Sequence, residues 1–143
     1  MRCGTAAPHY VERVGASKAA TSATESPAVG GDQAADAVRR LEEMAADVRG
    51  CALLDGDGKV LAASGDAEAR DDWADAAEGL FAAADAAREE PAGQIHVGTE
   101  EGEVFAVRHA GLAMIAVSDR FTLGSLLFSD MRVVLRDVAR GAA

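Results

Sequence analysis

The chain has 143 residues, of which 49% are apolar, which is enough for one hydrophobic core but not for two. Its net charge is −10, and the residues from Asp32 onward carry 22 acidic and 11 basic side chains. An acidic surface repels phosphate groups, so this balance argues against nucleic-acid and lipid-headgroup partners.

Residues 1–31 are rich in Ala, Ser, Thr and Gly, and their few large apolar side chains show no period. We therefore predict a disordered N-terminal tail followed by one domain over residues 32–143, because the tail cannot bury enough surface to offset its ordering entropy. A short recognition peptide and a start site placed too far upstream are the alternatives. No stretch resembles a secretory signal or a membrane span, so we expect a cytoplasmic protein without membrane insertion.

The first predicted helix begins with Asp32 as its N-cap and ends at Gly50, which would adopt the left-handed conformation. Two short apolar strands follow, Cys51–Leu54 and Val60–Ser64, and the turn between them contains two Asp-Gly steps. Such steps are typical of hairpins, so Asp57 and Gly58 are assigned to a structural turn. A calcium loop is the alternative, but the spacing of its oxygen ligands does not fit.

A second predicted helix begins at Asp71 or Asp72 and extends to about Glu89, before Pro91. One side is acidic, and the rest is an apolar surface rich in alanine. Gly79 in its middle indicates either a close contact or a tolerated defect. The acidic residues are Asp71, Asp75, Glu78, Asp85 and Glu89.

Three further strands are predicted over residues 94–99, 103–109 and 112–117, and Thr122 is expected to cap a final helix. The buried stripe of that helix is predicted to comprise Leu123, Leu126, Leu127, Val134, Leu135 and Val138. The order α-β-β-α-β-β-β-α with successive hairpins predicts an α+β fold with an antiparallel sheet. Three helices cover two apolar sheet faces incompletely, so burial alone predicts a homodimer.

No catalytic constellation is apparent from the residues. The histidines are scattered, the serines lack a nucleophile-elbow pattern, and Cys51 lies in an apolar run typical of a buried thiol. The glycines of the Asp-Gly turn do not form a dinucleotide fingerprint, and no phosphate-loop motif is present. We therefore predict a protein that is not an enzyme and that has no cofactor and no metal site.

Three stretches resemble the roadblock family of dynein light chains and their prokaryotic relatives: Val48 to Ala62, Ile95 to Val107, and Thr122 to Leu127. The resemblance implies a five-stranded antiparallel sheet with two helices on one face and the middle helix on the other. It also implies a homodimer through the middle helix and the third strand. Carried over residue by residue, the dimer interface would involve Leu80, Phe81, Ala84, Ile95 and Val97.

Prokaryotic roadblock proteins often act beside small Ras-like GTPases, as activators or scaffolds. The resemblance therefore implies a homodimeric regulator of such a GTPase in a signalling module, and no GTPase-contacting residue is assigned. A regulator of this kind would stimulate hydrolysis by positioning the groups of the GTPase itself. The alternative is a small-ligand sensor, since folds of this size often enclose a pocket.

Overall fold

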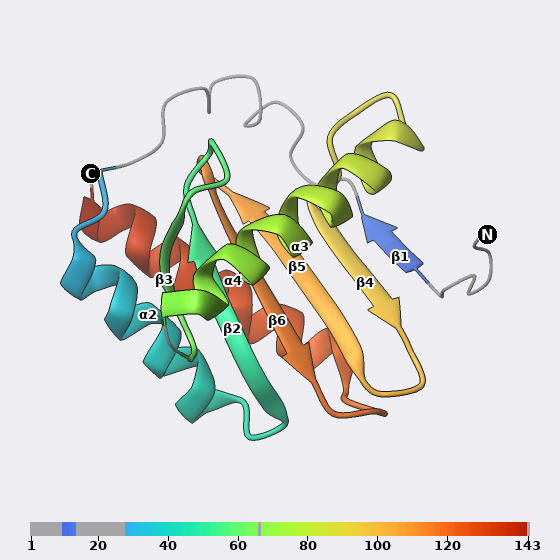
Figure 1. Ribbon diagram of the computed structural model, residues 1–143, viewed down its shortest axis with the longest axis horizontal. Helices are drawn as coiled ribbons and strands as arrows, with labels where there is room; N and C mark the ends of the chain where they lie inside the picture. The colour runs from blue at the N-terminus through green and yellow to red at the C-terminus, as the bar shows by residue number, and fades with distance from the viewer. Residues whose placement is uncertain (1–9, 14–27, 66, 143) are drawn as a thin grey trace.

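One antiparallel sheet with helices on both faces forms the centre of the structure (Figure 1). The computed structural model describes residues 10–13, 28–65 and 67–142, which form three helices and six strands in the sheet order β1-β4-β5-β6-β2-β3. Along the chain the elements are β1 (Tyr10–Arg13), α2 (Gly31–Met44), β2 (Val48–Leu54), β3 (Val60–Ala63), α3 (Ala67–Ala86), β4 (Gln94–Gly98), β5 (Glu103–His109), β6 (Leu112–Ser118) and α4 (Gly124–Ala142). The three helices and the strands β2 to β6 confirm the predicted order and the α+β fold.

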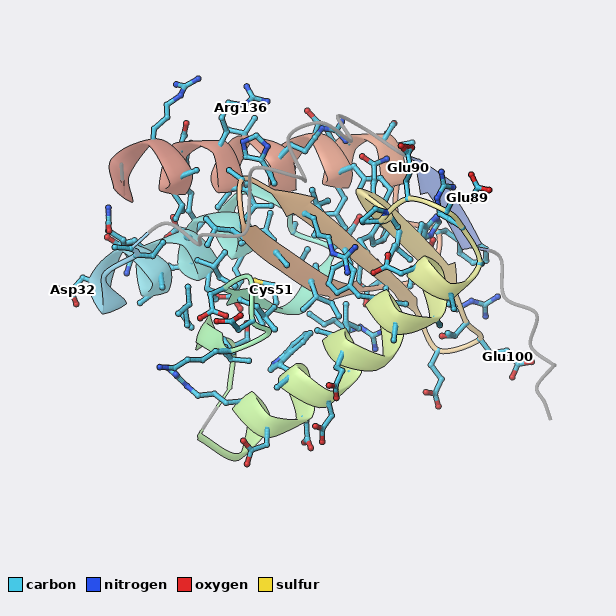
Figure 2. All side chains as sticks on the ribbon, turned by 90° about the horizontal axis from the view of Figure 1, so that it is seen from above. Asp32, Cys51, Glu89, Glu90, Glu100 and Arg136 are labelled. Carbon is cyan, nitrogen blue, oxygen red and sulfur yellow. The ribbon has the colours of Figure 1, made fainter. Side chains whose placement is uncertain are left out.

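The two faces of the sheet have separate cores, and their arrangement confirms the predicted layers. Helices α2 and α4 cover one face, where Leu41, Phe105 and Met131 are fully buried. Helix α3 crosses the other face alone, over Ile95 and Ile115. Figure 2 looks at the layers from above and shows α3 on the side of the sheet opposite α2 and α4.

Strand β1 is a sixth strand that the sequence did not predict. Tyr10 pairs with Val97 and Arg13 pairs with Gln94, so β1 lies along the outer edge of β4. The predicted tail therefore contains a strand at residues 10–13, because the unpaired backbone groups of an edge strand can bind any extended segment. Residues 1–9 and 14–27 of the predicted tail lie outside the described residues.

The predicted role of Gly50 as a helix end was wrong. Helix α2 ends at Met44, and Gly50 lies inside β2, where it pairs with Val117 of β6. A Cβ atom at Gly50 would lie 3.2 Å from Cζ2 of Trp73. Glycine at this position therefore lets the indole of α3 lie directly on the sheet.

Two predicted helix caps were also wrong. The N-cap of α2 is Gly30, not Asp32, and the backbone N–H of Gly30 donates to Oε1 of Gln33 at 3.0 Å. Thr122 lies in the loop before α4, and its hydroxyl donates to the Asp119 carbonyl at 2.7 Å. Asp32 instead lies in the first turn of α2, where a carboxylate interacts favourably with the helix dipole.

The predicted buried stripe of the last helix is partly wrong. Leu127, Val134, Leu135 and Val138 are buried as predicted, but Leu123 is 65% exposed and Leu126 is 57% exposed. Because α4 begins at Gly124, its buried stripe instead includes two residues that the prediction omitted, Phe128 and Met131.

Candidate protein-binding surfaces

Helix α3 has two chemically different sides. At about 100° per residue, Trp73, Ala76, Leu80 and Ala83 lie on one side of the buried line through Ala77, Phe81 and Ala84. We call this set the alanine flank. The other side carries Asp71, Asp75, Glu78 and Asp85, which we call the acidic flank.

The alanine flank adjoins a stripe of half-buried valines on the sheet. Strand pairing places Val97, Val104 and Val117 side by side on β4, β5 and β6, in line with Gly50 of β2. Trp73 of the alanine flank lies over Gly50, so the stripe begins beneath this flank. All three valines keep part of their surface, because α3 covers the sheet only in part. We call them the valine stripe.

The five predicted interface residues occupy two different environments. Phe81 is 8% exposed and both Ala84 and Ile95 are 0% exposed, so these three pack between α3 and the sheet of their own protomer. Leu80 and Val97 are half-buried and retain surface. Within the predicted set, only Leu80 and Val97 can offer side-chain area to a second copy without repacking.

Asp55, rather than the predicted Asp57, holds the structural turn between β2 and β3. Gly58 has φ +86°, which explains the glycine. The carboxylate that holds the turn belongs to Asp55, whose Oδ1 accepts the N–H groups of Asp57 at 2.9 Å and Lys59 at 3.0 Å. An aspartate that accepts the N–H two residues ahead is a known turn pattern, so the sequence contained this signal.

A groove lies beside the acidic flank of α3. It has a volume of about 810 Å³ and is bounded by α3, the β2–β3 turn and the β5–β6 turn. Arg108 of β5 lies in it with its guanidinium 4.0 Å from the centre of the Phe81 ring. The same guanidinium donates to both carboxylate oxygens of Asp85, at 3.0 and 2.9 Å, and to the Ala92 carbonyl at 3.1 Å.

The pKa of Asp85 reflects this contact with Arg108. Partial burial by itself raises the pKa of the carboxyl, but the hydrogen bonds from Arg108 and the Ala92 N–H, with the Arg108 charge, outweigh it. The net result is a pKa below the usual aspartate range. The Asp85–Arg108 pair is therefore charged at neutral pH and fixes one wall of the groove.

Among the described residues, the cysteine and histidine side chains do not form a reactive group. Cys51 lies on β2 (Figure 2). Burial, and then the nearby Glu42 carboxylate, raise the pKa of its thiol to about 12, so it stays protonated at neutral pH. His96 bonds Glu103 and stacks on Phe105 with ring centres 4.3 Å apart. Burial, and then the Arg136 charge, lower the pKa of His109. Across residues 10–13, 28–65 and 67–142, no group of three or more His, Cys, Asp or Glu side chains could hold a metal ion.

An exposed apolar tip follows β6. Phe121 is 85% exposed and has φ +64°, a conformation that costs a non-glycine residue roughly 1–2 kcal/mol. The exposed side chains of Leu123 and Leu126 follow it along the chain. The loop is ordered by the Thr122 N–H, which donates to the Glu103 carboxylate at 3.0 Å. The prediction missed this tip because it assigned both leucines to the core.

No helix in the described part of the chain is long and apolar enough to cross a membrane.

Neither a family model nor a curated protein matches the sequence. Solved structures match the fold. A Roadblock/LC7 domain from Streptomyces avermitilis is 19% identical with a TM-score of 0.63, over 78% of this chain and 95% of that one. The gliding protein MglB from Thermus thermophilus is 18% identical with a TM-score of 0.66, over 81% and 96%.

More distant in shape is profilin IB from Acanthamoeba castellanii, which is 18% identical with a TM-score of 0.52, over 76% of this chain and 98% of that one. The two bacterial matches have higher TM-scores and cover most of both chains. The chain therefore has the Roadblock/LC7 fold, as its sequence resemblance implied.

Proposed function

We propose that this protein is a homodimeric, non-enzymatic regulator or scaffold of a small Ras-like GTPase. The observation that carries the proposal is the apolar surface formed by the alanine flank and the valine stripe. The Roadblock/LC7 fold supports it, because prokaryotic proteins of the family that the sequence resembles act beside such GTPases. The GTPase would supply the nucleotide site.

The apolar surface has the chemistry of a dimer interface. Trp73, Leu80 and the valine stripe are all half-buried in the protomer, and a second copy would complete their burial. Full burial of one large apolar side chain contributes about 1.5–3 kcal/mol, so completing several of them offers several kcal/mol toward association. The exposed Ala76 and Ala83 have short side chains that let two helices approach closely.

Strand β1 restricts how the two copies can meet. It already occupies the outer edge of β4, so a dimer that joins two β4 strands edge to edge requires β1 to leave. A dimer that joins the two faces through the alanine flank and the valine stripe leaves β1 in place. We propose the second arrangement, with Leu80 and Val97 as contacts.

The test is a binding experiment with a Ras-like GTPase from the same organism. The two purified proteins are mixed with the GTPase loaded with GDP or with a non-hydrolysable GTP analogue, and masses are measured by light scattering on a sizing column. We expect a complex containing two copies of this chain, formed in one nucleotide state in preference to the other. A GTPase that elutes alone in both states would contradict the proposal.

Single-turnover GTP hydrolysis then separates an activator from a scaffold. Acceleration of hydrolysis in the complex identifies an activator, and an unchanged rate with intact binding identifies a scaffold. Hydrolysis of GTP by this chain without the GTPase would contradict the non-enzymatic assignment.

A further inference from the structure

The groove beside the acidic flank is lined by both apolar and charged residues. Of its apolar residues, Ala74 and Ala82 of α3 keep exposed surface, whereas Leu54, Phe81 and Ala113 are at most 8% exposed. Along α3 the groove extends from Ala74 to Asp85, which corresponds to about 16 Å at 1.5 Å per residue. It is therefore an open trough with room for a short segment of chain.

The rim of the groove is negatively charged. Five carboxylates and two guanidinium groups line it, from Asp55, Asp57, Asp75, Glu78, Asp85, Arg108 and Arg132. Asp85 and Arg108 neutralise each other, and Arg132 bonds Gln94. Among the described residues, the exposed carboxylates of Asp75 and Glu78 have no ion-pair partner. An anionic ligand would be repelled, and a cationic one would be attracted.

We propose that this groove binds a segment of a partner protein that carries an apolar side chain flanked by lysine or arginine. The apolar side chain would lie against the exposed Ala82 of α3, because the Arg108 guanidinium already covers the Phe81 ring, and the flanking cations would meet Asp75 and Glu78. An amphipathic helix in an apolar groove is a common mode of peptide recognition. The site lies on the side of α3 opposite the alanine flank, so it does not depend on the proposed dimer or on a GTPase.

The length of the groove favours a chain segment over a small molecule. The unpaired carboxylates Asp75 and Glu78 lie one helical turn apart, a spacing that matches two basic residues three or four positions apart on a helix. A free amine would use only one end of the trough. The small-ligand alternative therefore becomes one arm of the test.

The experiment measures the fluorescence anisotropy of three labelled 14-residue helical probes with the full-length protein. One probe combines leucine with lysine, one leucine with glutamate, and one serine with lysine. We expect only the leucine-lysine probe to bind, and raising the salt concentration from 50 to 500 mM should weaken it several-fold. Binding of the leucine-glutamate probe, or equal binding of the serine-lysine probe, would overturn the proposal.

Matched variants locate the site. Asp75→Lys combined with Glu78→Lys should weaken binding of the leucine-lysine probe at least tenfold, while Asp72→Lys, exposed on the same helix but outside the groove, should change it less than twofold. Ala82→Trp should also weaken binding by filling the groove. Circular dichroism checks that each variant is folded. Equal losses in the Asp72 and the Asp75/Glu78 variants would overturn the proposal.

A competition experiment tests whether the groove binds a small amine instead of a peptide. Hexylamine, at up to millimolar concentration, has an ammonium group and an apolar chain but no peptide. We expect it to leave the leucine-lysine probe bound over the whole range. If hexylamine displaces the probe, a small amine can occupy the groove and the peptide proposal is overturned.

Discussion

The two flanks of α3 show how one helix can present two surfaces of different chemistry. On one side, Trp73, Ala76, Leu80 and Ala83 continue onto the valine stripe, so the surface is apolar and shallow. On the other side, carboxylates line a groove whose guanidinium groups are already bound. An apolar surface gains most by covering itself with an identical one, whereas a like-charged surface repels its own copy. This difference underlies our two proposals, self-association through the alanine flank and binding of a foreign, basic partner at the acidic flank.

The largest effect is expected from a charge placed on the alanine flank. Leu80→Glu would put a carboxylate into the proposed dimer interface, and we expect at least 100-fold weaker dimerisation, about 3 kcal/mol. Sedimentation velocity over a range of protein concentrations measures the dissociation constant. Ala82→Glu is the control, because this exposed position on the same helix faces the groove. Equal effects of the two substitutions would remove the distinction between the flanks.

The Asp85–Arg108 ion pair, which fixes one wall of the groove beside the acidic flank, can be tested by substitution. Arg108→Ala removes the cation that lies on Phe81 and leaves the partly exposed Asp85 without its partner. We expect a loss of about 1–2 kcal/mol in the free energy of unfolding, of which the ion pair contributes less than half because solvent screens it. Urea unfolding at pH 7 measures it, and unchanged stability would contradict the wall's structural role.

The pH dependence of the same variant gives a second readout. The pKa of Asp85 is lowered in the folded state, so its stabilisation is complete above the unfolded aspartate pKa of about 3.9 and is lost as pH falls through the folded pKa. The stability difference between wild type and Arg108→Ala should therefore shrink as pH falls below about 4. Asp85→Asn should also lack this pH-dependent part but keep the Phe81 contact. A difference that grows with acidification would contradict the assignment.

Two glycines, at positions 50 and 79, lie close to the alanine flank or within the same helix. Gly50→Ala would bring a Cβ atom within 3.2 Å of Trp73 Cζ2, so we expect the indole to shift and the protein to lose about 1 kcal/mol. Because the chain has one tryptophan, its fluorescence emission reports the shift directly.

Gly79→Ala is the matched substitution for Gly50→Ala. Nothing lies within 4 Å of a Cβ atom at Gly79, so the protomer should gain about 1 kcal/mol from the better helix propensity. A gain in protomer stability with weaker dimerisation would identify Gly79 as a close contact between copies. A gain with unchanged dimerisation would identify it as a tolerated defect. A loss of protomer stability would contradict the open position of Gly79.

The smallest effect is expected at β1. Val11→Pro and Glu12→Pro each remove a backbone N–H, and since alternate N–H groups of a strand point to its partner, one of them breaks the β1–β4 ladder. If the copies meet through their faces, the dimer dissociation constant should change less than twofold. A marked strengthening in sedimentation would show that β1 competes with the second copy for the β4 edge.

Most of the fold could be predicted from local patterns. The alternation of Gln94 to Thr99, the doubly apolar run from Leu112 to Val117 and the Asp-Gly turn all predicted elements that the structure contains. The acidic side of α3 was also apparent, because helical spacing alone groups its carboxylates.

Features that depend on contacts between distant residues were missed. Gly50 looked like a helix end because its contact with Trp73 is invisible in the sequence. The groove is formed by α3, the β2–β3 turn and the β5–β6 turn, which lie far apart in the sequence. Strand β1 depends on an edge supplied by a strand some 80 residues away. Leu123 and Leu126 were assigned to the core because apolar spacing cannot tell where a helix begins.

Cross-linking of single cysteines at neighbouring positions of α3 tests whether two copies meet through the alanine flank. Ala83→Cys lies on the alanine flank and Ala82→Cys lines the groove, and both positions are exposed. Each variant also carries Cys3→Ser, while the thiol of Cys51 stays buried. With a short bismaleimide cross-linker, we predict a covalent species of twice the 14.7 kDa protomer mass for Ala83→Cys and none for Ala82→Cys. A covalent dimer through Ala82→Cys alone would contradict the assignment of self-association to the alanine flank.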